Sequence, residues 1–152
     1  MSPTAANHSL PEVILWAGAI SGSIDLCAAL TFAALRGTTP KRVLQAIASA
    51  MIGPKAFDRS STVSLGLGLH YLIAFSVATT YVVASRYLTV LTEHSLLSGI
   101  LYGAAVHLFM TFVVLPLSAL KRPFSMTFFL GQLVIHMFCI GLPIAFVVKH
   151  FS

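Results

Sequence analysis

The sequence predicts an all-α integral membrane protein: a four-helix bundle of membrane spans, with a short amphipathic interfacial helix in the first cytoplasmic loop. Two observations predict this fold. The first is composition, since 57% of the 152 residues are hydrophobic and only 9% are charged, whereas soluble domains carry about 25% charged residues. The second is that the apolar residues fall into stretches long enough to cross a bilayer, which makes lipid the predicted partner of their surface. We expect one membrane domain covering residues 1–152.

The four spans are predicted at about 13–35, 63–85, 96–118 and 126–148. Each is close to the ~20 residues that a helix rising ~1.5 Å per residue needs to cross a ~30 Å hydrocarbon core. They are expected to be helices because lipid offers no hydrogen bonds to free backbone groups.

Small residues and prolines in these spans predict close helix packing and kinks. Two pairs of glycines stand four residues apart, which lets helix backbones approach closely; they are Gly18 with Gly22 and Gly99 with Gly103. Pro116 and Pro143 are expected to kink the third and fourth spans. The predicted bundle is therefore compact, and a homo-oligomer or a larger membrane complex remains open.

A separate short helix is predicted at about 40–52, within the loop 36–62. Thr39 is the expected N-cap and Pro40 the first helical residue. Apolar side chains follow at helical spacing, and Gly53 with Pro54 ends the run. The pattern is typical of an amphipathic helix at the membrane surface, and a stiff connector without a further role is the alternative.

The positive charges predict the orientation. Seven Lys and Arg residues flank one side of the predicted bundle, namely Arg36, Lys41, Arg42, Lys55, Arg59, Lys121 and Arg122. Only Arg86 and Lys149 flank the other side. Because positive loops stay in the cytoplasm, both termini are predicted to be periplasmic. The cations lie between apolar spans and not on a soluble basic face, so nucleic acid is not an expected partner. Residues 1–11 lack the features of a cleaved signal peptide.

One residue that can carry charge stands in each span: Asp25, His70, His107 and His136. Counted from the cytoplasmic end of each span, these residues lie at similar depths of roughly 10–17 Å. A charged residue at the centre of a membrane helix is unfavourable by about 2.5–3.5 kcal/mol, so the four side chains are expected to face the bundle interior.

Three chemistries suit this layer. The set Asp25, His70, His107 and His136 offers ligands for a transition metal, and pairs among the three histidines offer axial ligands for haem b. Ser21, Asp25, His107 and His136 also form a candidate proton relay, because histidine titrates near neutral pH. No diagnostic motif selects among metal, haem and proton, and the cofactor stays unknown.

The alternative is that the polar layer only holds the helices together, in a structural or accessory membrane subunit. No catalytic motif is present, so an enzyme is the less favoured interpretation, and a transporter would need to dimerise. Cys27 and Cys139 are expected to be small core residues. His8, His94 and His150 lie outside the spans and are expected to be solvated.

Two stretches resemble the YagU-like family of uncharacterised bacterial inner-membrane proteins. One begins at His70, continues as Tyr-Leu-Ile-Ala-Phe-Ser and reaches Tyr81; the other is 97–103 and runs on to 115–120. A histidine like His136 also fits, whereas Asp25 and His107 are not part of the family pattern. The resemblance implies a multi-pass protein of the bacterial inner membrane, linked to acid tolerance, and supplies no substrate.

Overall fold

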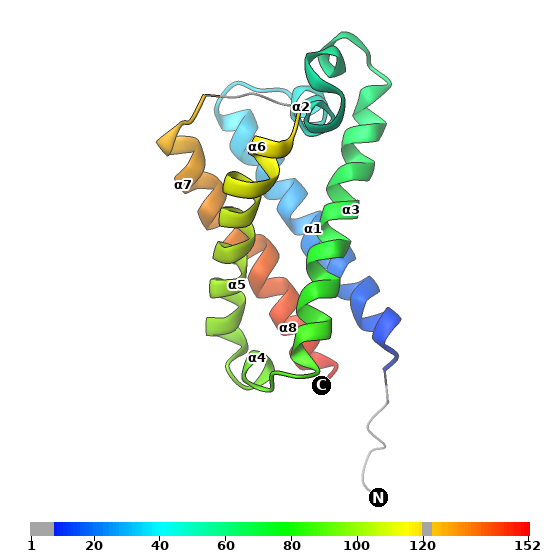
Figure 1. Ribbon diagram of the computed structural model, residues 1–152, viewed down its shortest axis with the longest axis vertical. Coiled ribbons are helices and arrows are strands. Elements are labelled where there is room, and N and C mark those ends of the chain that lie inside the picture. The colour runs from blue at the N-terminus through cyan, green and yellow to red at the C-terminus, as the bar shows by residue number, and fades with distance from the viewer. Residues whose placement is uncertain (1–7, 120–122) are drawn as a thin grey trace, which may run out of the picture.

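The computed structural model describes residues 8–119 and 123–152, and this part of the chain forms helices and no strands (Figure 1). In chain order the elements are α1 (Leu10–Leu35), α2 (Pro40–Ile52), the 3-10 helix η1 (Gly53–Asp58), α3 (Thr62–Ser85), α4 (Val90–Glu93), α5 (Ser95–Phe109), the π-helix η2 (Met110–Val114), α6 (Leu115–Leu117), α7 (Met126–Ile135), the π-helix η3 (His136–Gly141) and α8 (Leu142–His150). The prediction of an all-α fold is confirmed.

Four continuous helical segments are long and apolar enough to cross a membrane: Leu10–Leu35, Thr62–Ser85, Ser95–Leu117 and Met126–His150. They match the four predicted spans to within three residues at every end. Their outer surfaces are strongly apolar; Leu72 on α3 is 62% exposed and Leu101 on α5 is 60% exposed. Lipid is the solvent that tolerates such a surface. The chain therefore has the fold of a small multi-pass membrane protein.

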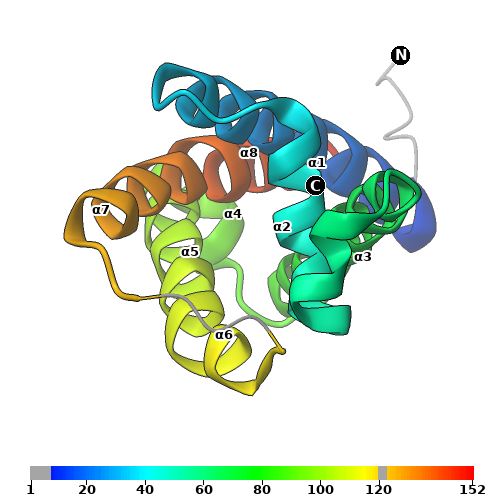
Figure 2. The same ribbon diagram turned by 90° about the horizontal axis from the view of Figure 1, so that it is seen from above.

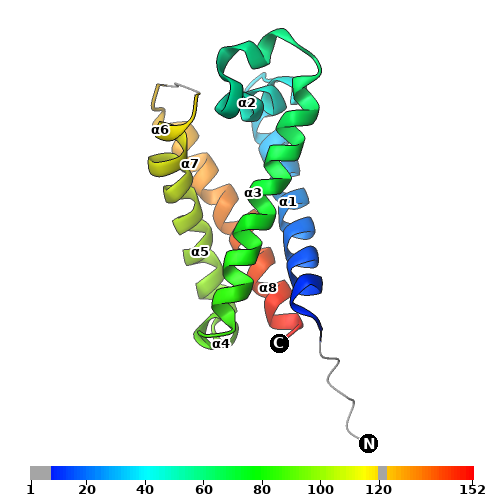
Figure 3. The same cartoon turned by 45° about the vertical axis from the view of Figure 1, so that its right-hand side comes forward.

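The bundle consists of two halves that diverge. In one half α1 packs along α3; in the other α5 packs against η3 and α8. The α1 helix also contacts α8 and η3, so it joins the halves at the back, whereas α3 and α5 have almost no contact. Figure 3 shows the consequence, a V that opens toward α2 and narrows toward α4. We call these two ends of the bundle the α2 end and the α4 end.

An apolar core fills the α4 end. Its buried members come from α1, α3, η3 and α8, and they are Val13, Ala17, Ala78, Tyr81, Val82, Ile140, Ile144, Ala145 and Val148. Among the described residues no comparable core fills the α2 end, where α2 lies across the top of α1 and α3 (Figure 2). The bundle is therefore tightly packed at the α4 end and loosely packed at the α2 end.

Glycines allow the closest helix contacts, as their spacing predicts. A Cβ atom on Gly22 would lie 2.9 Å from the Cβ of Ala74 on α3. A Cβ on Gly103 of α5 would collide with the carbonyl oxygen of His136 and lie 2.6 Å from the Cα of Met137. The two backbones of the second half are thus in direct contact at the depth of His136.

The bends at the two span prolines include π-helices, which the sequence did not predict. Pro116 is preceded by the π-helix η2 and Pro143 by the π-helix η3. Proline has no N–H, so the carbonyl four residues before it loses its usual partner. A π-turn lets such a carbonyl bond five residues ahead instead. The irregularity therefore extends over a full turn of each span.

The helix predicted in the first loop is confirmed as α2. The Thr39 side chain accepts a hydrogen bond from the Arg42 backbone N–H at 3.4 Å, and Gly53 follows the last residue with φ 72°. Gln45 is buried against the loop that follows, since its Nε2 donates to the Arg59 carbonyl at 3.0 Å. The helix is therefore docked on the bundle, and its position at a membrane surface stays a prediction.

The described cations divide as the sequence suggests, with Arg36, Lys41, Arg42, Lys55 and Arg59 at the α2 end and Arg86 and Lys149 at the α4 end. Lys121 and Arg122 lie outside the described residues.

His94 and His150 are exposed, as expected for solvated residues, whereas His8 is less exposed than they are. It is only partly exposed, because its ring packs edge-on against Phe151 at 4.4 Å and its Nδ1 lies 3.2 Å from Oε1 of Glu12.

Candidate functional site

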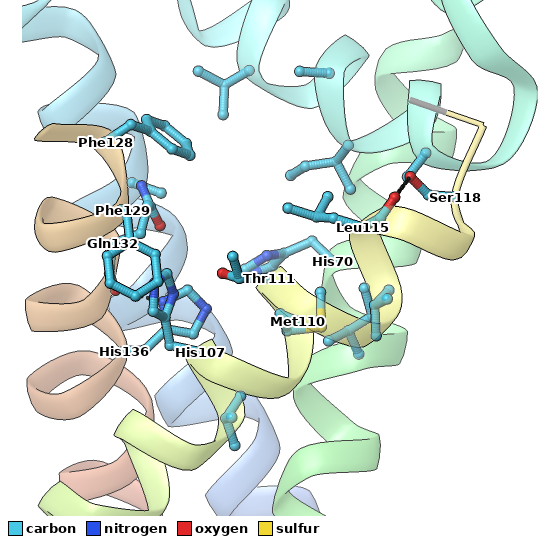
Figure 4. Close-up of a pocket in the computed structure, with 18 of the residues that line it drawn as sticks. His70, His107, Met110, Thr111, Leu115, Ser118, Phe128, Phe129, Gln132 and His136 are labelled. Atoms are coloured by element: carbon cyan, nitrogen blue, oxygen red, sulfur yellow. Dashed lines mark hydrogen bonds between the residues drawn. The ribbon is translucent and has the colours of Figure 1, made fainter. Parts of the chain in front are cut away.

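A large cavity occupies the hollow α2 end of the bundle. Its volume is about 1430 Å³, and its walls come from both halves of the V. Asp25, His70, His107 and His136 all line it, together with Gln132; Figure 4 labels the three histidines and Gln132 on its wall. The four ionisable residues of the spans therefore share one space, and they lie at its deep end, next to the apolar core.

His107 and His136 are in direct contact across α5 and the start of η3. Their ring centroids are 5.1 Å apart and the planes are tilted by 51°. This approach depends on Gly103, which brings the α5 backbone against the His136 carbonyl. The Nδ1 atom of His136 lies 2.7 Å from the carbonyl oxygen of Gln132. Since a carbonyl only accepts, Nδ1 donates there, and Nε2 of a neutral His136 ring is left as an acceptor.

His107 is buried, with 4% exposure, yet its Nε2 atom makes no hydrogen bond within the described part of the chain. Its ring packs on Phe129 with centroids 4.8 Å apart. A buried polar atom without a partner is unfavourable by about 1–3 kcal/mol. Such an atom on a cavity wall is therefore a candidate for binding something that enters the cavity.

Asp25 has the same property. It is 7% exposed, and its Oδ1 atom has no hydrogen-bond partner among the described residues. His136, His70 and Cys139 are described ionisable side chains that lie close enough to interact with it electrostatically. A bare carboxylate at this depth is strongly disfavoured unless a proton or a cation balances it. Asp25 and His107 are thus the two groups of the layer whose hydrogen bonding is incomplete.

His70 has a different environment. Its Nε2 lies 2.8 Å from the carbonyl oxygen of Gly22 on α1, and its ring packs on Tyr71 with centroids 5.4 Å apart. The hydrogen bond links α3 to α1, so His70 contributes to helix packing as well as to the cavity wall.

Ser21, the remaining member of the predicted relay, lies outside the cavity lining. It is fully buried, and its Oγ donates to the Ala17 carbonyl at 2.6 Å. The cavity therefore brings together Asp25, His107 and His136 but not Ser21. Cys139 is partly buried, whereas Cys27 is exposed on α1, so the prediction that both cysteines are core residues is wrong for Cys27.

The geometry does not fit a metal ion or haem b. Among residues 8–119 and 123–152, no three His, Cys, Asp or Glu side chains come close enough together to hold a metal ion. Haem would need two axial histidines on opposite faces of the porphyrin. His107 and His136 are in ring contact, which leaves no room for a macrocycle between them, and His70 is engaged with Gly22.

Sequence reasoning missed Tyr102, which links α5 to α3 next to the cavity-lining residue Val77. Its Oη donates to the Val77 carbonyl of α3 at 2.7 Å, and its ring meets that of Tyr81 edge-on with centroids 4.9 Å apart. A tyrosine among small residues, in the run Tyr102-Gly103-Ala104, is the only signal that the sequence offers. The Tyr102 hydrogen bond thus joins the two halves of the V on the α4 side of the polar layer.

Comparison of the chain with family models, with curated proteins and with solved structures finds no match, so the arguments that follow rest on the residues themselves.

Proposed function

We propose that this chain is a membrane protein that takes up and releases a proton at a site formed by Asp25, His107 and His136. One observation carries the proposal: two buried polar atoms, Oδ1 of Asp25 and Nε2 of His107, lack hydrogen-bond partners on the same cavity. A proton is the smallest species that can bind at Asp25 in this space. It neutralises the carboxylate, whose burial is otherwise costly, and imidazoles are the side chains best suited to exchange it near neutral pH.

His136 lies between the two unsatisfied groups. It is in ring contact with His107 and within electrostatic reach of Asp25. Its Nε2 is a free acceptor when Nδ1 donates to Gln132. A proton that reaches the deep end of the cavity therefore meets three acceptors there, His107, His136 and Asp25.

Of the two ends of the bundle, the cavity is continuous with the α2 end in the described part of the chain. The cavity reaches Arg36 and Arg42 at the α2 end, whereas the apolar core separates it from the α4 end. This arrangement suits reversible proton binding, as in a sensor or a proton-coupled binding protein, and does not suit conduction across the bundle. We further propose that the α2 end faces the cytoplasm of a bacterium, with both termini periplasmic, because five of the seven described cations lie there.

Infrared difference spectroscopy on the reconstituted protein tests the proposal. Lowering the pH should produce the carbonyl stretch of a protonated, buried carboxyl group. Asp25→Asn should remove this band, and His107→Asn should shift the pH at which it appears. Asp58→Asn is the matched control, because Asp58 is exposed in η1. A band that is insensitive to Asp25→Asn, or the absence of any such band, would refute the proposal.

The second candidate is a structural or accessory subunit, and the His70 hydrogen bond to Gly22 favours it for that residue. It gives no account of why Asp25 and His107 are left without partners. The stability measurements described in the Discussion separate the two.

A further inference from the structure

The cavity is far larger than proton binding requires. Its volume of about 1430 Å³ exceeds the ~300–1,000 Å³ of pockets that hold drug-sized molecules. Its walls are mainly aliphatic and aromatic, with side chains such as Leu69 and Ile73 on α3 and Met110 and Val113 on η2. A space of this kind suits a long apolar molecule better than an ion or a sugar.

The few contacts between α3 and the α5–η2 segment point to a lateral opening of the cavity between them, which we call the window. Two hydrogen bonds frame it. Toward the α4 end, Tyr102 Oη donates to the Val77 carbonyl at 2.7 Å. Toward the α2 end, the Ala119 backbone N–H donates to the Ala50 carbonyl at 2.8 Å, which ties the end of α6 to α2. Between these two ties α3 and η2 do not pack together (Figure 3).

The window opens toward the lipid, because the helices on both of its sides are membrane spans. Val113 on η2 lines the cavity and is also 41% exposed. An apolar molecule dissolved in the bilayer can therefore enter sideways without crossing water.

The polar groups at the deep end of the cavity define the head of such a molecule. His107 Nε2 and Asp25 Oδ1 have no hydrogen-bond partner among the described residues, so a head that carries hydrogen-bonding groups suits this position. An anionic head is disfavoured beside the buried Asp25 carboxyl group. Aromatic rings surround the position, since Phe129 packs on His107 at 4.8 Å and on Phe112 at 6.1 Å. Flat rings pack well in such surroundings.

We propose that the cavity binds a membrane-dissolved amphiphile with an uncharged, hydrogen-bonding ring as its head and an apolar tail, the chemical class of the isoprenoid quinones. The head ring lies against His107 and Asp25, and the tail leaves through the window between α3 and η2. The inference rests on the proposed function in one respect, because the same two residues serve both.

Binding to the full-length protein in detergent tests this inference, with a benzoquinone carrying a ten-carbon tail as the probe and titration calorimetry as the readout. We expect saturable binding of one molecule per chain and none with the tail-less ring. His107→Phe keeps an aromatic ring but removes the hydrogen bond, so the Kd should rise about tenfold. Ile73→Trp fills the cavity without touching the polar groups and should abolish binding.

Leu72→Trp is the matched control, since Leu72 is the neighbouring residue on α3, is 62% exposed and does not line the cavity. It should bind the probe as the unmodified chain does. Equal binding by all variants, or no saturable binding, would overturn the inference. So would tighter binding of an anionic phospholipid that is lost in Arg36→Gln with Arg42→Gln, because the occupant would then be a lipid held at the α2 end.

The infrared experiment separates this inference from the proposed function. In Ile73→Trp the band of the protonated Asp25 carboxyl should persist while quinone binding is lost. A protein that shows the band but never binds the probe would retain the proton site and lose the quinone. A protein that binds the probe but lacks the band would retain the quinone site and lose the proton site.

Discussion

Two glycines on α3 provide a matched test of how α2 is held on the bundle. Gly66 and Gly68 are two residues apart on the same helix. A Cβ on Gly66 would collide with the carbonyl oxygen of Leu44 in α2, whereas a Cβ on Gly68 would meet nothing within 4 Å. We therefore compare Gly66→Ala with Gly68→Ala.

The expected magnitudes follow from these contacts. Alanine in place of glycine stabilises a helix by about 1 kcal/mol at either position. At Gly66 this gain is opposed by overpacking, which typically costs about 1–3 kcal/mol. The upper value applies because the opposing atoms are main chain, with the Leu44 carbonyl carbon at 2.7 Å and its Cα at 3.2 Å, and cannot rotate away. Gly66→Ala should therefore lose about 2 kcal/mol and Gly68→Ala gain about 1 kcal/mol.

The assay is unfolding by SDS titration in mixed micelles, followed by far-ultraviolet circular dichroism. The two variants should differ by about 3 kcal/mol in the free energy of unfolding, with the unmodified chain between them. Equal stability of the two variants would refute the reasoning, because it would mean that α2 does not rest on the α3 backbone at Gly66.

Three further predictions use the same unfolding titration. Asp25→Leu should raise the free energy of unfolding by about 1 kcal/mol or more, because it removes a buried, unpaired carboxyl oxygen. His70→Leu should lower it by about 0.6–1 kcal/mol, because it removes the hydrogen bond to the Gly22 carbonyl. A loss of stability in both variants would favour the purely structural role. Tyr102→Phe removes the hydrogen bond to Val77 and should cost about 1 kcal/mol, so an unchanged midpoint would contradict the tie between the two halves. Thr39→Ala should cost about 0.5–2 kcal/mol through the lost helix cap, with Thr39→Ser restoring it; failure of serine to restore stability would argue against capping.

The sequence predicts most of the fold because the length and composition of a span can be read from the local sequence, without knowledge of tertiary contacts. The four spans and the helix between Thr39 and Gly53 need only local rules, and each is confirmed. The π-helices were not predictable from those rules. Their formation depends on how the helices pack around Pro116 and Pro143, and the prolines alone predicted simple kinks.

The sequence predicted how deep the site residues lie along their helices, but not the directions in which their side chains point. Equal depth along four helices places Asp25, His107 and His136 in one layer, and all three line the cavity. Ser21 is one turn from Asp25, yet it turns to the Ala17 carbonyl and away from the cavity. The rotation of each helix about its axis and the contact of His107 with His136 depend on the crossing at Gly103, which no single segment encodes.

The contact between His8 and Phe151 has a consequence for the order of the helices in the chain. Their rings lie 4.4 Å apart, so the first and last described turns meet at the α4 end (Figure 1). Adjacent ends are the condition under which a chain can be closed by a short linker and reopened elsewhere without moving its elements. A circular permutant that begins near Met126 would place the α7–α8 segment ahead of α1 and keep every interhelical contact. The order in which the helices follow one another along the chain is thus separable from the way they pack.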